Sequence, residues 1–364
     1  MSSCHKLVWS AALGYFLALS ACNSTTAPVS LADPLATAAQ AAALDSAFAS
    51  PVVASFQALG SRIDATPAPP LITGAVGALR LAPLVSLADE GRALRQAVSS
   101  LASLAATGIF PPTLLGAVFS WDPNLHSYYV SSPTGGPSNG IRFLLYAINP
   151  LTDEPATPLD QIGYVDLMDE SSGGIARLHI QVKDKGETVT YLDYLFSGSG
   201  TSTMFSASVT GTITNGLGGA ANKTLTFSVA ITGNASSVTL TATYTLNNPS
   251  VTVQETVTVA DDGTTTTLTL DFTFSRTGQT VQIVGTVTAS DATGSGTVNI
   301  SFKVNGSTFA TLTGTTSNLA LTKTGGGQLT AGEQLALASL FEVAANAAEK
   351  IGDLFQPAER TLGF

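Results

Sequence analysis

The sequence predicts a mainly β protein of the α+β class, in which one large antiparallel sheet packs on helices from the N-terminal and C-terminal parts of the chain. Three observations support this prediction. Apolar and polar residues alternate with a period of two from Leu115 to Thr322, short turn signals interrupt the alternation, and both flanking stretches show helical periodicity. Connections this short permit only antiparallel neighbours. We therefore expect a meander of about 12 to 15 strands, and a sheet of that size has to be curved or closed.

Residues 34–108 are predicted to form a mostly helical leader. Asp33 and Ser50 each precede a proline, and an N-cap residue followed by proline in the first turn is typical of a helix start. Further along, apolar residues recur at spacings that place them on one helix face: Leu94, Val98, Leu101 and Ala105. Gly108 then stands where a helix C-cap belongs.

Residues 115–322 are predicted to be strands and turns. The clearest strand is Thr265 to Ser275, where Leu or Phe occupies every even position from 268 to 274 while Thr, Asp or Ser occupies every odd one. Only an extended strand puts these two sets on opposite faces. The same alternation predicts strands near 115–121, 125–131, 141–148, 161–168, 175–183, 225–231, 238–246, 251–259, 281–287 and 298–304. Asn305-Gly306, between two such runs, is the strongest hairpin signal.

A long amphipathic helix is predicted over residues 329–356. Thr330 and Glu333 have the spacing of a capping box. An apolar stripe follows at alternating spacings of four and three: Leu337, Phe341, Ala344, Ala348, Ile351 and Phe355. Packing the terminal helices against the apolar face of the sheet buries both surfaces at once, so we expect residues 34–364 to form a single domain.

The first 22 residues have the layout of a secretory signal. Lys6 supplies a basic start, Leu7 to Leu19 form an apolar segment, and small residues follow. Leu19-Ser20-Ala21-Cys22 resembles the lipobox of bacterial lipoproteins. The resemblance implies a signal peptide at 1–21 and a lipidated tether at 22–33, with Cys22 carrying a diacylglyceryl thioether and an acylated amine, the acyl chains being fatty acids such as palmitate. Ordinary cleavage near Ala21 and an uncleaved apolar leader are the alternatives.

A lipidated Cys22 predicts a cell-envelope protein anchored to a membrane, because two acyl chains give stable attachment. Asn23 differs from the aspartate that resembles an inner-membrane retention signal, so we favour the outer membrane over the inner membrane. Removal of residues 1–21 takes away Lys6, which leaves 14 Lys and Arg against 25 Asp and Glu, a net charge of −11. Nucleic acid is excluded as a partner because its binding needs a basic surface.

Thiol chemistry is also excluded for the mature chain. Cys4 leaves with the signal and Cys22 becomes a thioether, so no disulfide, thiolate metal site or cysteine nucleophile remains. Gly136 to Gly140 matches the G-x-S-x-G spacing of a nucleophile elbow around Ser138. An elbow needs a strand before the serine and a helix after it, whereas here a loop precedes and a strand-like run follows. We therefore interpret the match as a plain loop.

Metal and cofactor chemistry have little support in the sequence. His126 and His179 are the histidines of the mature chain, which rules out a three-histidine zinc site, and His179 alternates with polar residues on the expected outer face. An acidic cluster could supply oxygen ligands to calcium, although the EF-hand spacing is absent: Asp160, Asp166, Asp169 and Glu170. We favour solvated strand ends near Arg142 or Arg177. We expect no enzyme activity, catalytic residue, metal or cofactor.

Glu255 is the anomaly of the sheet. It shares the predicted apolar face of its strand with four valines: Val251, Val253, Val257 and Val259. A buried charge needs a partner or loses its charge. Three interpretations stay open: an ion pair with Arg92 or Arg95, a bulge that turns the side chain outward, and a polar group that lines a binding cavity.

In outline, a curved sheet with covering helices on a lipid anchor resembles the half-barrel lipoprotein carriers of the bacterial envelope, which enclose acyl chains. This chain differs from them in its larger number of strands and its alanine-rich leader. The resemblance implies that a lipid or another hydrophobic small molecule binds between sheet and helices. The alternative is a surface structural or adhesion lipoprotein with a solid core, since Thr-rich strands with few charges are common in exposed β domains.

Overall fold

The computed structural model describes residues 31–62 and 108–340, apart from 202, 235, 291–294 and 316–317. The signal, Cys22, the apolar stripe at 94–105 and the stripe from Phe341 onward lie outside these residues. The described chain begins with α2 (Pro34–Ala42), the short 3-10 helix η1 (Ala43–Phe48) and α3 (Pro51–Arg62). Both predicted helix starts are confirmed. Asp33 Oδ1 accepts a hydrogen bond from Ala36 N at 3.1 Å, and Ser50 Oγ accepts one from Val52 N at 3.3 Å.

The β region contains two further short 3-10 helices, η3 (Pro112–Leu114) and η4 (Gly219–Ala221), and a long series of strands. The strands are β1 (Val118–Asp122), β2 (Ser127–Ser132), β3 (Gly140–Tyr146), β4 (Ile148–Asn149), β5 (Glu154–Pro155), β6 (Gln161–Asp169), β7 (Ala176–Asp184), β8 (Thr190–Gly200), β9 (Phe205–Thr214), β10 (Thr224–Gly233), β11 (Ser237–Leu246), β12 (Val251–Asp261), β13 (Thr265–Arg276), β14 (Gln279–Ser290), β15 (Gly296–Val304), β16 (Ser307–Thr315) and β17 (Asn318–Lys323).

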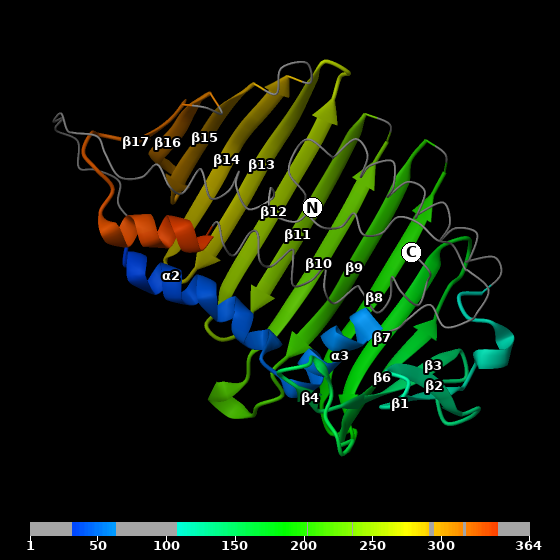
Figure 1. Ribbon diagram of the computed structural model, residues 1–364. Helices are drawn as coiled ribbons and strands as arrows, with labels where there is room; N and C mark the ends of the chain where they lie inside the picture. Colours follow the sequence, from blue (N-terminus) through cyan, green and yellow to red (C-terminus); the bar gives the residue numbers. More distant parts are fainter. Residues whose placement is uncertain are drawn as a thin grey trace.

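Fifteen of these strands form one sheet in the order β17-β16-β15-β14-β13-β12-β11-β10-β9-β8-β7-β6-β3-β1-β2. From β6 to β17 every strand pairs antiparallel with the next one in sequence, as Figure 1 shows. The predicted large antiparallel sheet is therefore confirmed. The sheet is open, with β2 and β17 at its two edges, so the closed alternative is wrong.

The N-terminal edge departs from the predicted meander. β1 pairs with β3 in parallel, at Val118 with Arg142 and Phe119 with Phe143. β2 follows β1 as a hairpin on the outer side, so the chain has to cross back before β3 can join the sheet. β4 and β5 form a separate two-stranded hairpin. Alternation alone could not predict this order because it gives each strand's faces and says nothing about its neighbour.

The Asn305-Gly306 hairpin is confirmed. Asn305 and Gly306 have φ values of 49° and 81°, and the strands pair on either side of them at Val304 and Ser307. Two central residues with positive φ match the turn that suits the right-handed twist of paired strands. Asparagine and glycine adopt these angles at low cost.

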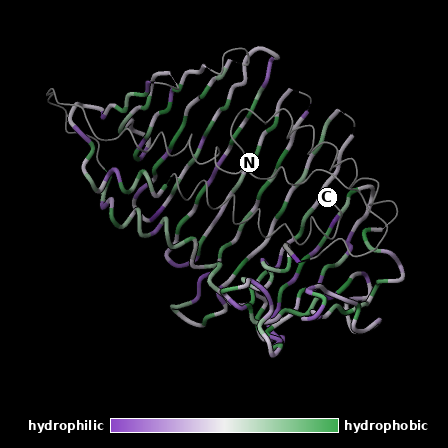
Figure 2. The backbone as a smooth tube through the Cα atoms, in the orientation of Figure 1, coloured by the Kyte–Doolittle hydropathy of each residue, from purple (hydrophilic) through white to green (hydrophobic). Residues whose placement is uncertain are grey.

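The two faces of the sheet differ in polarity, and hydropathy alternates along the strands in Figure 2. The hydrophobic core lies on one face and includes Phe227, Phe272, Phe274 and Phe302 from the strands. Leu44, Val53, Phe56 and Leu59 of the N-terminal helices belong to the same core. So do Ala336, Leu337 and Leu340 of a C-terminal helix whose described part is residues 331–340. The helices therefore cover part of the apolar face.

The covering helices gather at one end of the strands. α2 and the helix of residues 331–340 lie side by side along that end in Figure 1, and a Cβ on Gly332 would stand 3.5 Å from Pro34 Cβ. α3 contacts β3, β6, β7 and β8. Among the described residues, no helix combines the length and the hydropathy that a membrane crossing requires.

Candidate functional site

Glu255 lies in the middle of β12 on the apolar face. β12 pairs with β11 and β13 without a register shift, and Glu255 stands directly between Ala242 of β11 and Phe272 of β13. An unbroken register excludes the bulge that would have turned the side chain outward. Glu255 is 6% exposed, among Val253 and Val257 of its own strand.

The Glu255 carboxyl group lacks a partner at one of its oxygens. Oε2 is buried and accepts no hydrogen bond. Burial raises the pKa of Glu255 to about 7, because a charge is costly to hold among apolar side chains. Arg92 and Arg95, the predicted ion-pair partners, lie outside the described residues. Within the part of the chain that the structure describes, Glu255 is a buried acid that titrates near neutral pH.

Tyr244 is the titratable neighbour of Glu255. It lies on β11 opposite Val253, two pairs along the strand from Ala242 and Glu255 and therefore on the same face, and it is 3% exposed. Burial raises the pKa of Tyr244, and the Glu255 carboxylate raises it further. The phenol therefore stays neutral throughout the range in which Glu255 changes its charge.

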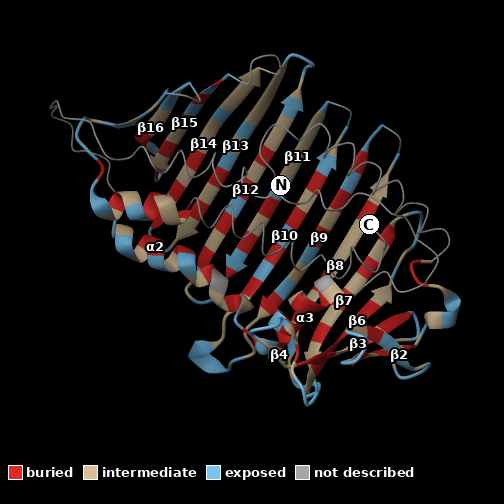
Figure 3. Cartoon of the chain, viewed as in Figure 1, coloured by how far each residue is buried: buried red, intermediate tan, exposed pale blue. Residues whose placement is uncertain are grey.

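Glu255 stands at a boundary on the apolar face. Toward the helix-covered end, the next pairs on these strands are fully buried and include Tyr244, Leu246, Val251, Val253 and Phe274. Toward the other end lies a group of half-buried residues that we term the distal apolar patch: Val238, Leu240, Val259, Leu268, Leu270 and Val287. These residues adjoin across four strands, since Val238, Val259, Leu268 and Val287 pair in one row. Figure 3 shows the change along the strands from buried to intermediate.

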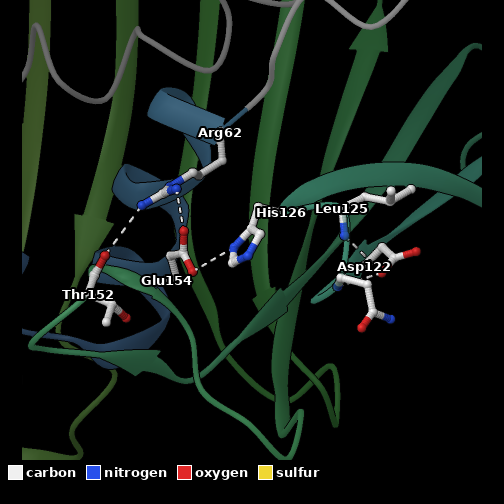
Figure 4. Close-up of polar contacts among 7 residues, drawn as sticks. Arg62, Asp122, Leu125, His126, Thr152 and Glu154 are labelled. Atoms are coloured by element: carbon white, nitrogen blue, oxygen red, sulfur yellow. Dashed lines mark hydrogen bonds and ion pairs between the residues drawn. The ribbon is translucent and has the colours of Figure 1, made fainter.

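His126 lies in a surface cluster at the N-terminal edge of the sheet. Glu154 accepts a hydrogen bond from Arg62 Nη1 at 2.8 Å through Oε1, and its Oε2 lies 3.0 Å from His126 Nδ1 (Figure 4). The cluster links α3 to the β4-β5 hairpin and to the turn before β2. The His126 ring is largely exposed, and the Glu154 carboxylate is shared between Arg62 and His126. We therefore interpret this cluster as a structural contact.

His179 lies on the polar face, as predicted, and both of its ring nitrogens face carboxylates. Nδ1 is 2.8 Å from Glu170 Oε1, and Nε2 is 2.7 Å from Asp193 Oδ1. Partial burial opposes the charge, but the hydrogen bonds to Asp193 and Glu170 outweigh it, so the pKa of His179 is raised. Sequence reasoning predicted neither contact. Asp193 lies on the next strand, β8, and only the register of β7 and β8 brings it within reach of His179.

The predicted acidic cluster does not converge on one point. Asp166 forms a two-pronged ion pair with Arg142 at 2.7 and 2.8 Å, which confirms the expected arginine partner. The expected solvated strand end is wrong for Asp166, because this residue is buried within β6. Asp169 accepts hydrogen bonds from the backbone of Ile109 and Ser171, while Glu170 binds His179. Asp160 precedes β6 and is exposed. Within the described ranges, no three His, Cys, Asp or Glu residues are grouped so that they could hold a metal ion.

Ser138 lies in a turn that leads into β3, so no helix follows it as a nucleophile elbow requires. The glycines around it have packing roles. A Cβ on Gly140 would stand 1.9 Å from Leu167 O, and one on Gly136 would stand 2.8 Å from Ala117 O. Comparisons with protein families, with curated proteins and with solved structures found no match to this chain. A proposal for the function therefore has to rest on the fold and on the surroundings of Glu255.

Proposed function

We propose that this protein is an envelope lipoprotein that binds a lipid or another hydrophobic ligand on the apolar face of its sheet. One observation carries the proposal: Glu255, a buried carboxyl group with an unsatisfied oxygen, borders the distal apolar patch. Ligand sites for hydrophobic molecules are mostly apolar and contain a few polar groups that fix orientation. Glu255 and the patch have these two properties.

The distribution of burial supports the same proposal. Leu240, Leu270 and Val287 pack against the core but are only half-buried. The apolar residues nearer the helices on the same strands are fully buried. Contiguous apolar surface that stays accessible in a soluble domain often marks a binding site. An acyl chain on this surface would remove more apolar area from water, at about 25 cal/mol for each Å².

The proposed anchor is Cys22, which would hold the domain at a membrane, with the outer membrane favoured over the inner membrane. A tether of about ten residues from 23 to 32 would separate the lipid from the first helix. A membrane-anchored domain with an apolar binding face is suited to hold a lipid away from the bilayer. We propose no enzymatic step for it.

The alternative is a surface structural or adhesion lipoprotein without a ligand. It is favoured by the Thr-rich polar face and by the two open edges of the sheet at β2 and β17. Unpaired edge strands can pair with another chain. Under this alternative, the distal apolar patch has no small-molecule occupant, and this difference can be measured.

The test is a binding experiment on delipidated protein with Nile red, a neutral hydrophobic dye, together with mass spectrometry of molecules that co-purify. We expect saturable binding that Leu270→Lys abolishes, because the variant places a charge in the distal apolar patch. Thr269→Lys is the matched control, since Thr269 is exposed on the opposite face of β13. Absence of saturable binding and of co-purified lipid would contradict the proposal and favour the structural alternative.

A further inference from the structure

We infer that Glu255 receives the cationic head group of a long-chain amine, so that the ligand class is a cationic amphiphile and not a fatty acid. The inference rests on the proposed function and makes it more specific. Its basis is the set of groups around the carboxyl and the absence, among the described residues beside Glu255, of a cation that could pair with an anionic ligand.

The surroundings of Glu255 leave one kind of interaction unmet. Its cross-strand neighbours are Ala242 and Phe272, and its own strand contributes Val253 and Val257. None of these side chains donates a hydrogen bond, and Oε2 accepts none. An ammonium group has three donors and a positive charge, so it would satisfy the oxygen and neutralise the carboxylate together. Ala242 is the smallest of the four neighbours.

An anionic head group would meet a different situation on this face. Lys323 lies at the edge of the sheet, in the cross-strand row that contains Glu255. Both of its described hydrogen bonds go to Glu333. Arg276, beyond Phe274 on β13, donates to the carbonyl oxygen of Ala32 and to Gln279 Oε1. Among the described residues of the apolar face, Lys323 is therefore already paired with a carboxylate. Arg276 has an Nε without a described partner, but it pairs with Val251 at the helix-covered end of β12 and does not lie beside Glu255. A fatty acid would therefore place its charge near Glu255 without compensation.

The charge of the whole molecule favours the same ligand class. With 14 Lys and Arg against 25 Asp and Glu after residue 21, the mature chain has a net charge of −11. A field of this sign raises the local concentration of cations and lowers that of anions. Long-range attraction and the local carboxyl group thus select the same head group.

Affinity for an amine should depend on pH in a defined direction. The pKa of Glu255 is raised to about 7 by burial, so the carboxyl is mostly neutral below that pH and mostly charged above it. Tyr244, the titratable group beside it on β11, stays neutral over this range. Binding of an alkylammonium should therefore tighten as the pH rises through about 7, which is well below the pKa of an aliphatic amine at about 10.

The test uses three ligands of equal chain length, dodecylamine, dodecanol and dodecanoic acid, each in competition with Nile red on the delipidated protein. At about pH 8 we expect the amine to bind at least about tenfold more tightly than the acid, with the alcohol between them. Glu255→Gln should lose this preference for the amine and retain the alcohol. Asp271→Asn, on the exposed opposite face of β13, is the matched control because it removes a carboxylate without touching the apolar face.

Four outcomes are informative, and the first supports the inference. A preference for the amine that grows from about pH 6 to about pH 8 and is absent in Glu255→Gln supports it. Equal binding of amine and acid, with the alcohol bound as well, overturns it and leaves the proposed function intact. Binding of none of the three overturns both. A large loss of thermal stability in Glu255→Gln without a change in head-group preference identifies Glu255 as the partner of a structural arginine such as Arg92 or Arg95, and also overturns it. Should Glu255→Gln fail to fold, the pH series on the unchanged protein still decides.

Discussion

Lys323, the last residue of β17, donates hydrogen bonds to both carboxylate oxygens of Glu333, at 3.0 and 2.9 Å. The same carboxylate closes a capping box, since Glu333 Oε2 accepts from Thr330 N at 2.8 Å and Thr330 Oγ1 accepts from Glu333 N at 3.2 Å. The Lys323 and Glu333 side chains are 11% and 5% exposed. One side chain thus starts the helix at 331–340 and fixes it to the edge strand of the sheet.

Removing one member of this pair should cost far more than removing both. Glu333→Gln leaves the Lys323 ammonium buried without its counter-charge, and breaking a buried pair in this way typically costs about 3 to 5 kcal/mol in the free energy of unfolding. Lys323→Met combined with Glu333→Gln should recover much of that loss. Urea denaturation of the two single variants and the double variant measures the coupling. Additive losses in the double variant would show that the two groups act independently.

The helix at 331–340 should contribute to the core through one face. Leu337 is 1% exposed and belongs to the hydrophobic core, whereas Leu335 on the same helix is 50% exposed. Leu337→Ala should reduce the free energy of unfolding by about 2 to 5 kcal/mol. Leu335→Ala should change it by about 0.5 kcal/mol or less, as is usual for surface positions. Small and equal effects would mean that this helix contributes little to the stability of the sheet.

Stability should fall on the alkaline side of the His179 titration. Because Asp193 and Glu170 raise the pKa of His179 in the folded protein, its contribution to stability is fully present below the ordinary histidine pKa of about 6.5. This contribution is lost as the pH rises through the raised pKa of His179 in the folded protein. Thermal melts at a series of pH values should show this loss in the unchanged protein and a flatter profile in His179→Gln. NMR of the ring protons would report a pKa at or below the ordinary value if the two carboxylates do not hold the charged form.

Membrane attachment should depend on Cys22. Cys22→Ser removes the sulfur that the lipobox resemblance designates for acylation, so fatty-acid labelling should disappear and the protein should leave the membrane fraction or stay unprocessed. Cys4→Ser is the matched control, because Cys4 belongs to the segment that is expected to be removed. Normal processing and membrane retention of Cys22→Ser would refute the lipidation prediction.

Local features of the fold could be predicted because short stretches of sequence specify them. Asp33 and Ser50 start helices, Thr330 and Glu333 cap one, and Asn305-Gly306 turns a hairpin, each through contacts within a few residues. The Leu and Phe residues of β13 alternate because a strand alternates. Glu255 was found in the same way, as a polar residue in an apolar position.

Features set by partners distant in sequence could not be predicted. The sequence shows Lys323 and Glu333 as separate charged residues, but it does not show that they pair. Only the position of β17 at the sheet edge brings them together. The parallel pairing of β1 with β3 depends on where the chain crosses back, and the open form of the sheet depends on the sum of many small twists. The distal apolar patch was hidden for a similar reason. Its leucines and valines follow the same alternation as those nearer the helices, and among the described residues only the degree of burial distinguishes them.

The contacts of α2 impose an order of assembly. Thr37 Oγ1 donates to Gln279 Oε1 at 3.3 Å across 242 positions of sequence, and Arg276 binds the carbonyl oxygen of Ala32. The sheet from β6 to β17 can grow by adding each strand to the one before it, with short loops to close. During synthesis or export from the N-terminus, however, α2 emerges before the sheet, and these contacts cannot form until β13 and β14 exist. We propose that the N-terminal part of the chain carries the lipid. This part is made before the sheet, but α2 docks on the sheet only after β13 and β14 have formed. A nascent molecule can therefore be tethered before its sheet is complete.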